Sequence, residues 1–525
     1  MLSIDTESIS NSQKNHYIRL KMKRICLFIS LFYFTLTSVN GQVRFSKFYD
    51  YNHTANLISD VVVLGDTGYF TVSQCIDLSE TDTLNYAKTY LYFIRTNQFG
   101  DTVFTKQYHK SRFNIQGVHL IKTNWGYFLA GGEFDLKKYN DISLGSYIKL
   151  WKINDKGDTI STLNYDIQSG NDYSVTIINT NDNGFAVFGQ TCNQVQSGRK
   201  CNYFLMKLDS AGNKQWHQIY KQSSTSFENP NSVIQLSDGS FYLFGQSTLN
   251  SIMKWFLVKT DSLGNKLWQK TYSEYPRQAG IAMIEGEGNT ILLAGSYSTD
   301  VNGNPSGVVR GCTMLIDSSG NKQWSKSYGK ADLSGIYTSG LYSVTKKTNK
   351  YILAGVTNNY DSLDNGQGWL LAINFNGDSL FQRLYNVNPK LPEHIYAINK
   401  TNDGFLISGY GFTKIDSINS QDAWILKVDT LGCLTPGCQL VGINNIPISR
   451  EEIKIYPNPA KDKIQFEHSG KIISYRIADY SGKLLMSDNY LESGINIEHL
   501  ANGAYIVQIM LENNTQAFGK LIVEK

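Results

Sequence analysis

The chain has 525 residues, more than one ordinary hydrophobic core accommodates, and this length argues against a single compact domain. It contains 33 Tyr and 44 Gly but only 9 Pro, and its short apolar runs are interrupted by Asn, Asp and Gly, which indicates an all-β protein with many tight turns. The formal net charge is +4, and Lys and Arg are interspersed with Asp and Glu, so no basic face for a nucleic-acid partner is visible.

The first segment, residues 1–41, is predicted to be a signal-peptide region. Basic residues between Lys21 and Arg24 precede the apolar run ICLFISLFYFTLTSV, and a small-residue cleavage region ends at Gly41. The run is short and ends abruptly, so we expect cleavage and no transmembrane span in the mature protein, with an uncleaved anchor as the alternative. The residues before Met22 are polar, and Met22 opens a signal of normal proportions, so we expect it to be the true start.

A repeated unit follows the signal region. Each unit has a short alternating strand, a turn at Asp-Gly or Asn-Gly, an apolar strand, a variable stretch, a third strand, a turn around a second Gly and a fourth strand, as in residues 174–220. The second turn recurs at intervals of 57, 55, 52, 56, 57 and 55 residues, at Gly100, Gly157, Gly212, Gly264, Gly320, Gly377 and Gly432. The unit predicts a four-stranded antiparallel meander.

The fourth strand of each unit carries two aromatic positions. Four residues after the turn glycine stands Phe or Trp in five units, with Ser161 as the exception, and eight residues after it stands Tyr in all six units that continue. Even spacing within a strand places both positions on one face. We therefore expect these side chains to pack between neighbouring units.

Four strands per unit and a period of about 55 residues predict radial packing as the blades of a propeller. The seventh unit ends after its third strand, but Phe45 and Tyr49 lie four and eight residues after Gly41. We predict an all-β, seven-bladed β-propeller over residues 42–438. The segment RFSKFYD, residues 44–50, pairs with the strand from Trp424 to Asp429 and closes the ring, which removes two exposed edges.

The loops between the second and third strands vary in length and content, and they share one face with the blade-to-blade connections. Variable loops on a rigid scaffold are the usual place for recognition, although tolerated insertions are an equally good explanation. We expect a ligand rim on this face, with acidic candidates at Asp135, Asp141, Asp300 and Asp361.

One stretch of this rim imitates the start of a calcium loop. Asp300-x-Asn302-x-Asn304 has the spacing of the first ligands, but Pro305 stands where such a loop needs Gly. We therefore predict no cofactor and no metal site, with calcium at this position as the alternative to a hydrophilic hairpin tip.

Two classes of function remain open. The sequence has no G-x-S-x-G, H-E-x-x-H or P-loop motif and its eight histidines are scattered, so no catalytic residue is assigned. The favoured hypothesis is a non-enzymatic binding or adhesion scaffold for a glycan or protein ligand. The alternative is an extracellular polysaccharide hydrolase or lyase whose funnel is lined by carboxylates such as Glu133, Asp135, Asp141 or Asp361. Propellers support both functions.

Six cysteines remain after Cys26 leaves with the signal. Two pairs bracket short loops and predict local disulfides in an oxidising exterior: Cys192 with Cys201, and Cys433 with Cys438. Metal binding by a Cys-x4-Cys pair is the weaker alternative, because no second pair with zinc spacing lies nearby. Cys75 and Cys312 have no obvious partners.

The propeller pattern ends after Cys438. A linker at 439–452 precedes a module at 453–525, whose alternating strands and Gly turns predict a small β-sandwich of immunoglobulin-like type. The module resembles the type A C-terminal sorting domain of the type IX secretion system, also called the Por secretion system. The resemblance rests on Tyr456-Pro457-Asn458-Pro459, the turn from Asp479 to Gly482, Leu500-x-x-Gly503-x-Tyr505-x-Val507 and Gly519-Lys520.

This resemblance implies export across the inner membrane by the signal peptide and across the outer membrane under the direction of the sorting domain. Its implied partners are the secretion machinery and its sortase, which typically cleaves the domain. The cargo is then released, or attached at the surface of a Gram-negative bacterium through anionic lipopolysaccharide.

Overall fold

The computed structural model describes most of the chain from Val43 onward. The described residues are 43–50, 55–81, 87–109, 113–135, 146–168, 171–195, 198–275, 277–298, 309–329, 339–357, 366–387, 391–415, 418–435, 438, 453–467, 470–479, 484–490, 493–512 and 516–525. The predicted signal-peptide region and linker lie outside these residues.

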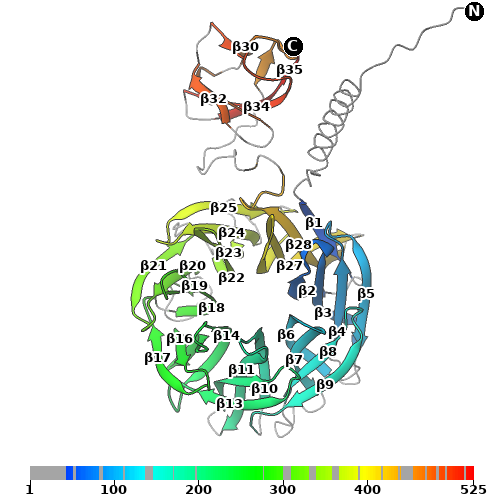
Figure 1. Ribbon diagram of the computed structural model, residues 1–525, viewed down its shortest axis with the longest axis vertical. Helices are drawn as coiled ribbons and strands as arrows, with labels where there is room; N and C mark the ends of the chain where they lie inside the picture. The colour runs from blue at the N-terminus through cyan, green and yellow to red at the C-terminus, as the bar shows by residue number, and fades with distance from the viewer. Residues whose placement is uncertain are drawn as a thin grey trace, which may run out of the picture. The chain divides into compact units, whose positions relative to one another are not determined.

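Seven four-stranded antiparallel sheets follow one another around a ring (Figure 1). Blades 1 to 4 are β2 (Ala55–Val63), β3 (Tyr69–Thr81), β4 (Ala87–Thr96) and β5 (Thr102–His109); β6 (Phe113–Thr123), β7 (Gly126–Asp135), β8 (Tyr147–Ile153) and β9 (Thr159–Tyr165); β10 (Asn171–Asn179), β11 (Phe185–Val195), β12 (Gly198–Leu208) and β13 (Lys214–Tyr220); and β14 (Phe227–Gln235), β15 (Phe241–Leu249), β16 (Ile252–Thr260) and β17 (Lys266–Tyr272). A short 3₁₀ turn, η1 (Gly65–Thr67), joins β2 to β3.

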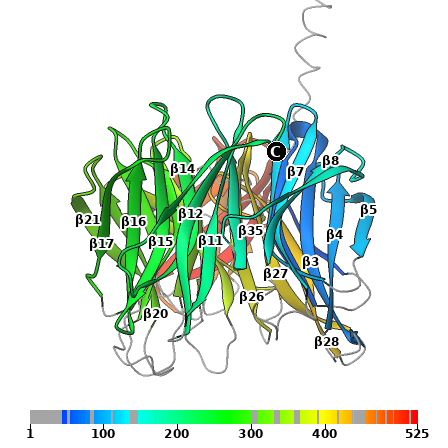
Figure 2. The ribbon, with the colours of Figure 1, turned by 90° about the horizontal axis from the view of Figure 1, so that it is seen from below.

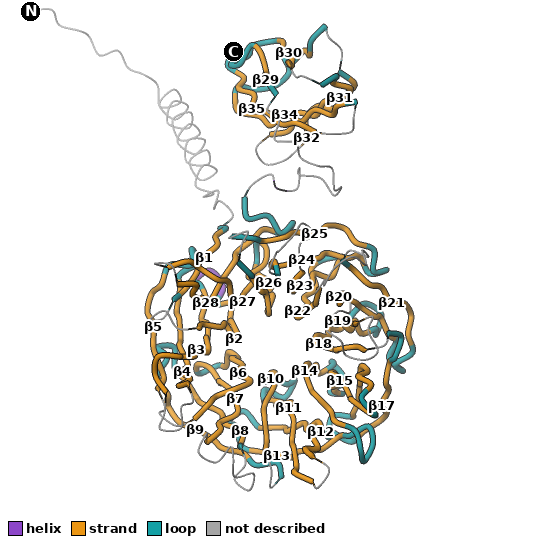
Figure 3. Tube along the Cα trace, turned by 180° about the vertical axis from the view of Figure 1, so that it is seen from behind, coloured by secondary structure: helices purple, strands orange, loops and turns teal. Residues whose placement is uncertain are grey.

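Blades 5 to 7 complete the ring. They are β18 (Arg277–Glu285), β19 (Ile291–Ser298), β20 (Val309–Ile316) and β21 (Lys322–Tyr328); β22 (Ser339–Lys347), β23 (Lys350–Thr357), β24 (Gln367–Asn374) and β25 (Ser379–Tyr385); and β26 (Glu393–Thr401), β27 (Gly404–Ile415) and β28 (Ile418–Asp429) with β1 (Phe45–Tyr49). The first strand of each blade lies nearest the ring axis (Figure 3), and the strands run between the two faces of the ring (Figure 2). The prediction of a seven-bladed all-β propeller is confirmed.

The hydrophobic cores of the propeller lie between neighbouring blades. One cluster joins Phe244 and Leu257 of blade 4 to Leu293 and Met314 of blade 5. Successive residues of a strand point to opposite faces of its sheet, so each apolar strand contributes to the cores on both sides of its blade. This double burial explains the short, almost continuous apolar runs of the second and third strands.

The predicted closure by the N-terminal segment is confirmed. β1 pairs antiparallel with β28, in a register from Phe45 opposite Lys427 to Tyr49 opposite Ala423. The guanidinium of Arg44 donates to the Asp429 carboxylate at 2.8 Å. β1 is thus the fourth strand of blade 7, although it begins the described chain.

The recurring tyrosine binds the turn of the next blade. Tyr49 Oη donates to Gly100 O at 2.7 Å, which connects blade 7 to blade 1. Four further tyrosines make the same bond at 2.7 to 2.8 Å: Tyr220 to Gly264, Tyr272 to Gly320, Tyr328 to Gly377 and Tyr385 to Gly432. Tyr165 also donates to Gly212 O. We call this contact the blade latch. It explains why the tyrosine and the glycine recur with one period.

The turn glycine fits the latch for two reasons. Gly320 has a φ of +76°, a conformation that side chains with a Cβ disfavour. A Cβ there would also lie 2.8 Å from a ring carbon of Trp268, the aromatic residue four positions after the preceding turn glycine. Asp317 orders the same turn, because its Oδ1 accepts the backbone N–H groups of Ser319 and Asn321 at 2.9 and 2.8 Å. The aromatic residues therefore pack between blades, as predicted.

The C-terminal module has two sheets. One contains β29 (Lys454–Tyr456), β30 (Lys463–Glu467) and β33 (Ile495–Asn496), and the other β32 (Leu484–Asn489), β31 (Ile472–Asp479), β34 (Gly503–Leu511) and β35 (Gln516–Val523). Both sheets contribute to one apolar core, with Ile455 and Ile464 from the first and Ile477, Val507 and Leu521 from the second. The predicted small β-sandwich is confirmed. Across the described ranges, no helix is long and apolar enough to cross a membrane.

Candidate functional site

A β-bulge interrupts the innermost strand of every blade. In blades 6 and 7 the pairing skips Tyr342 and Tyr396, so these residues have no partner position on β23 and β27. The same position holds Val175, Asn231 and Ile281 in blades 3, 4 and 5. A bulge re-aims the side chain of its extra residue, and here it does so on the strand nearest the axis. Tyrosine at this position in two adjacent blades distinguishes blades 6 and 7.

These two tyrosines belong to a continuous set of rings that we call the aromatic row: Tyr342, Tyr396, Tyr410, His394 and Phe412. Successive ring centroids lie 5.4 Å apart for Tyr342 and Tyr396, 5.8 Å for Tyr396 and Tyr410, and 5.9 Å for Tyr410 and Phe412. His394 lies opposite Tyr410 in the pairing of β26 with β27 and stacks on it at 4.9 Å, with 11° between the planes.

The aromatic row is partly open to solvent. Tyr396 is 37% exposed, and the other four side chains have intermediate exposure. Tyr342 lies back over Gly340, where a Cβ would come within 3.1 Å of its ring, so the absence of a side chain at Gly340 leaves room for this orientation. The row therefore offers aromatic surface at the inner edge of blades 6 and 7, near the ends of β26 and β27 that face the blade-to-blade connections.

The aromatic row carries no net charge at neutral pH. Burial lowers the pKa of His394, so the imidazole is neutral. Burial raises the pKa of Tyr342 to about 12 and also raises the pKa of Tyr396 and Tyr410, so their hydroxyls stay protonated. The row combines apolar ring faces with neutral hydrogen-bonding groups.

Three fully buried carboxylates lie on the innermost strands, three residues before the bulge, and bind the connections that enter their blades. Asp172 Oδ2 accepts the N–H of Ile167 at 2.7 Å, and Glu228 Oε1 accepts the N–H of Gln222 at 3.1 Å. Glu393 Oε1 likewise accepts a backbone N–H, from the connection that precedes β26, at 3.2 Å. Burial raises the pKa of Asp172 to about 6 and raises the pKa of Glu228. These groups hold loops and do not face solvent.

The sequence carries a signal for these carboxylates that the sequence motifs above do not include. The equivalent positions are polar in every repeat: Asn56, Asn114, Asp172, Glu228, Gln278, Ser339 and Glu393. A polar residue at one fixed place in an otherwise apolar strand indicates a repeated hydrogen-bonding task. For the aromatic row, the signal was Tyr at the same place in two consecutive repeats.

The acidic rim candidates are only partly described. Asp135 is the last residue of β7, opposite Phe113, and Glu133 lies opposite Ile115 on the same strand. Their side chains lie outside the described part, as do Asp141, Asp300 and Asp361, together with the calcium-like segment. Within the described ranges, no cluster of three or more His, Cys, Asp or Glu side chains could hold a metal ion.

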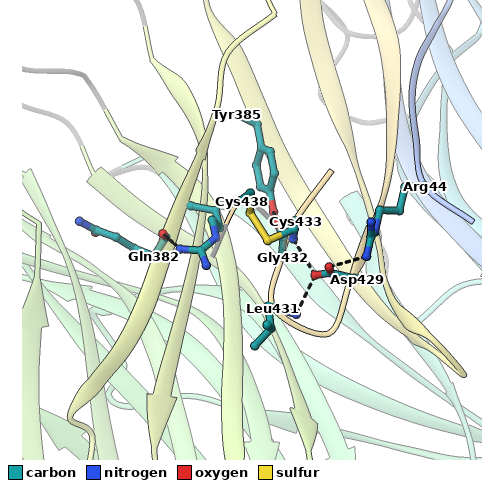
Figure 4. Close-up of a disulfide and its surroundings, with 9 residues drawn as sticks. Arg44, Gln382, Tyr385, Asp429, Leu431, Gly432, Cys433 and Cys438 are labelled. Carbon is teal, nitrogen blue, oxygen red and sulfur yellow. Dashed lines mark hydrogen bonds and ion pairs between the residues drawn. A yellow bond between two sulfur atoms is a disulfide. The ribbon is translucent and has the colours of Figure 1, made fainter. Parts of the chain in front are cut away.

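The two local disulfides are present. Cys192 and Cys201 face each other across β11 and β12, with their Cα atoms 4.0 Å apart. Cys433 and Cys438 close the turn at the end of blade 7, with a Cα separation of 5.5 Å (Figure 4). Cys75 and Cys312 are buried thiols.

The second disulfide stabilises the point where the chain leaves the propeller. Its Cys433 N–H donates to Asp429 Oδ1 at 2.8 Å, while the other carboxylate oxygen of Asp429 accepts from Arg44 (Figure 4). Tyr385 of blade 6 donates to Gly432 in the same turn. The last turn of the propeller therefore connects three strands that are distant in sequence.

In the C-terminal module, Tyr456, Pro457, Asn458 and Pro459 are all exposed, and both X-Pro peptide bonds of this motif are cis. Asn458 binds β35 from both ends of its amide: Nδ2 donates to Lys520 O at 2.6 Å, and Oδ1 accepts the N–H of Ile522 at 2.8 Å. The motif thus forms an exposed turn attached to the edge of the second sheet.

The downstream motif residues contribute to the fold of the module. Tyr505 Oη donates to Ala501 O at 2.6 Å, and Val507 is fully buried. Gly503 begins β34, and Gly482 lies outside the described residues. The recognisable motif therefore includes residues that stabilise the module as well as an exposed turn.

Several solved structures are similar to this chain at low identity. The polysaccharide lyase Uly1 is 7% identical, with a TM-score of 0.41 over 75% of this chain and 94% of that chain. The β-propeller domain of the Trilobed protease from Pyrococcus furiosus is 10% identical, with a TM-score of 0.38 over 72% and 96%. The α-L-arabinofuranosidase Arb93A from Fusarium graminearum is 10% identical, with a TM-score of 0.36 over 59% and 92%. No curated protein matches the sequence. Nothing about activity follows from these likenesses.

The C-terminal module has a family match. Residues 454–524 match the family described as the secretion system C-terminal sorting domain, and this range contains every strand from β29 to β35. Such a domain directs its protein through the type IX secretion machinery. The C-terminal module of this chain is therefore a type IX secretion sorting domain, and the protein is secreted or attached at the cell surface of a Gram-negative bacterium.

Proposed function

We propose that this protein is a non-enzymatic binding or adhesion protein whose propeller recognises a glycan or protein ligand outside the cell. The observation that carries the proposal is the aromatic row. Covering partly exposed aromatic rings with a ligand stabilises the complex by about 25 cal/mol per Å² of apolar surface buried. The seven-bladed propeller is a rigid scaffold that holds these aromatic side chains in place before the ligand binds. This limits the conformational entropy lost on binding.

The acidic rim candidates belong to the same proposal. Asp135, Asp141, Asp300 and Asp361 remain candidates for further ligand contacts from the variable loops. Recognition spread over several loops gives each contact a modest share of the binding free energy. Single replacements in the rim should therefore weaken binding in graded steps.

Polysaccharide hydrolysis or elimination is the competing function. A glycosidase needs two carboxyl groups that flank the scissile bond and are accessible to substrate. Three carboxylates of the innermost strands, Asp172, Glu228 and Glu393, are instead fully buried and accept backbone N–H groups. The partly exposed Asp60 of β2 also accepts a backbone N–H, from Leu120 of blade 2 at 3.0 Å. Their structural task favours binding over catalysis.

The test uses the secreted full chain with a panel of soluble polysaccharides and proteins. Binding predicts retention of a ligand that is recovered unaltered, with graded losses of affinity in Asp135→Ala and Asp361→Ala. An enzyme would release product, and one carboxylate replacement would abolish that release while leaving binding nearly intact. Turnover that disappears with a single carboxylate would refute the proposal.

We further propose that the exposed Tyr456-Pro457-Asn458-Pro459 turn and the Lys520 edge of β35 are what the machinery and its sortase read, and that anionic lipopolysaccharide is the anchor of the mature protein. Gly482, Gly503, Tyr505 and Val507 would maintain the fold of the signal. Truncation after Cys438 should leave a folded propeller in the periplasm, as measured by cell fractionation. Surface display of the truncated chain at normal levels would contradict the proposal.

A further inference from the structure

We propose that the aromatic row is a stacking site for a neutral oligosaccharide chain, bound through the C–H faces of its sugar rings. This inference rests on the proposed binding function and names its ligand class. The site consists of Tyr342 from blade 6 and of His394, Tyr396, Tyr410 and Phe412 from blade 7.

The first argument is charge. An anionic glycan or an acidic peptide is recognised by Arg or Lys, which pair with carboxylates and sulfates. The row instead presents protonated tyrosine hydroxyls and a neutral imidazole. Such groups suit a neutral ligand that both donates and accepts hydrogen bonds, as sugar hydroxyls do.

The second argument is shape. Tyr396 contacts rings on both sides, Tyr342 at 5.4 Å and Tyr410 at 5.8 Å, with interplanar angles of 40° and 38°. Rings already in contact leave no space for a small cation to enter between them, so the set is a platform and not an aromatic cage. A row of adjacent rings offers stacking positions to successive sugar residues and favours a chain over a single sugar.

The third argument is preorganisation. Tyr396 and Tyr342 are bulge residues, and the residues directly before and after each of them pair with β27 and β23, so the sheet holds both sides of each bulge. His394 stacks on one face of the Tyr410 ring and restricts its rotation. An aromatic platform held in this way loses little side-chain freedom when a ligand binds.

The experiment measures binding of the secreted full chain to neutral polysaccharides, namely xylan, mannan, mixed-linkage β-glucan and dextran, with alginate and chondroitin sulfate as anionic probes. Affinity electrophoresis identifies the retained polysaccharide, and calorimetry with its oligosaccharides gives Kd. Tyr396→Ala and Tyr410→Ala should each weaken binding by about tenfold, and Tyr396→Phe by less than about threefold, because the ring remains.

Ile281→Ala is the matched control, because Ile281 occupies the same bulge position in blade 5. It should leave binding unchanged. Affinity should rise from the disaccharide to longer oligosaccharides of the same linkage. Hydrogen exchange of the wild-type chain provides a measurement without substitutions: the bound oligosaccharide should slow amide exchange in β26 and β27, but not in β18.

Retention of no neutral polysaccharide, retention of anionic polysaccharides alone, or retention that Tyr396→Ala leaves unchanged would each overturn the inference. Binding of an unaltered protein or anionic glycan would leave the proposed function standing while this inference fails. Turnover of a polysaccharide that one carboxylate replacement abolishes would instead refute the proposed function, whatever Tyr396→Ala does to affinity.

Discussion

Replacing Tyr49 tests the closure of the propeller. Its ring is 9% exposed within the core between blades 7 and 1, and its hydroxyl donates to Gly100 O at 2.7 Å. Tyr49→Phe removes one buried donor and should lower the free energy of unfolding by about 1–2 kcal/mol. Tyr49→Ala also removes a buried aromatic ring, which costs about 3–5 kcal/mol.

Urea unfolding of the full chain, followed by tryptophan fluorescence, measures these changes. All eight tryptophans precede residue 439, so the signal reports the propeller and not the sorting domain. The matched controls are Tyr272→Phe and Tyr272→Ala, because Tyr272 makes the same bond to Gly320 O at 2.8 Å between blades 4 and 5.

The two Phe variants should lower the urea midpoint by similar amounts. Only Tyr49→Ala should also expose β1 to protease before the main transition, because β1 has no covalent link to β28 within blade 7. An unchanged midpoint in Tyr49→Ala, or a β1 segment as resistant to protease as in the wild type, would refute the view that this strand closes the ring.

Three further changes test the latch, a buried carboxylate and the exit disulfide, each by urea midpoint. Gly320→Ala should lower the free energy of unfolding by roughly 2–4 kcal/mol, because a Cβ there is strained at positive φ and displaces the ring of the preceding blade. Gly288→Ala is the control: its φ is +62° but the space around its Cβ is open, so the loss should be only about 1 kcal/mol. Equal losses would contradict the latch. Because burial raises the pKa of Asp172 to about 6 from 3.8, the folded state binds its proton more tightly, and the ionised group lowers stability increasingly between about pH 4 and pH 6. The wild type should therefore gain stability relative to Asp172→Asn as the pH falls from about 7 to about 5, and a pH-independent difference would contradict the raised pKa. Cys438→Ser should cost roughly 2 kcal/mol by opening a short loop, and a wild-type midpoint would show that the disulfide adds no stability.

The sequence contained most of the fold because every latch uses the same few residues. The glycine with positive φ recurs in all seven turns, and the tyrosine eight positions after the preceding glycine makes the same bond in the six latches described above, so both are visible as a period. The closure by Phe45 and Tyr49 followed from the same spacing, because Tyr49 makes the same bond to a turn glycine as the tyrosines of the other latches.

The aromatic row could not be predicted from this period. It occupies positions where the blades differ: the bulge residue is Val175 in blade 3 and Tyr396 in blade 7, and averaging over repeats hides that difference. Its contacts also depend on the pairing register, which places His394 opposite Tyr410. The acidic rim candidates lie in or beside the variable loops, whose lengths no repeat constrains, so composition alone suggested them.

The disulfide between Cys433 and Cys438 determines how a pulling force would enter the propeller. A ligand-bound propeller that is held to a cell through the chain after Cys438 bears tension under flow. That tension passes through a covalent bond to Cys433, whose N–H donates to Asp429, the residue that also accepts from Arg44. The load therefore enters the propeller at Cys433, next to the seam of β1 and β28, and the covalent bond keeps the short loop between the two cysteines from extending.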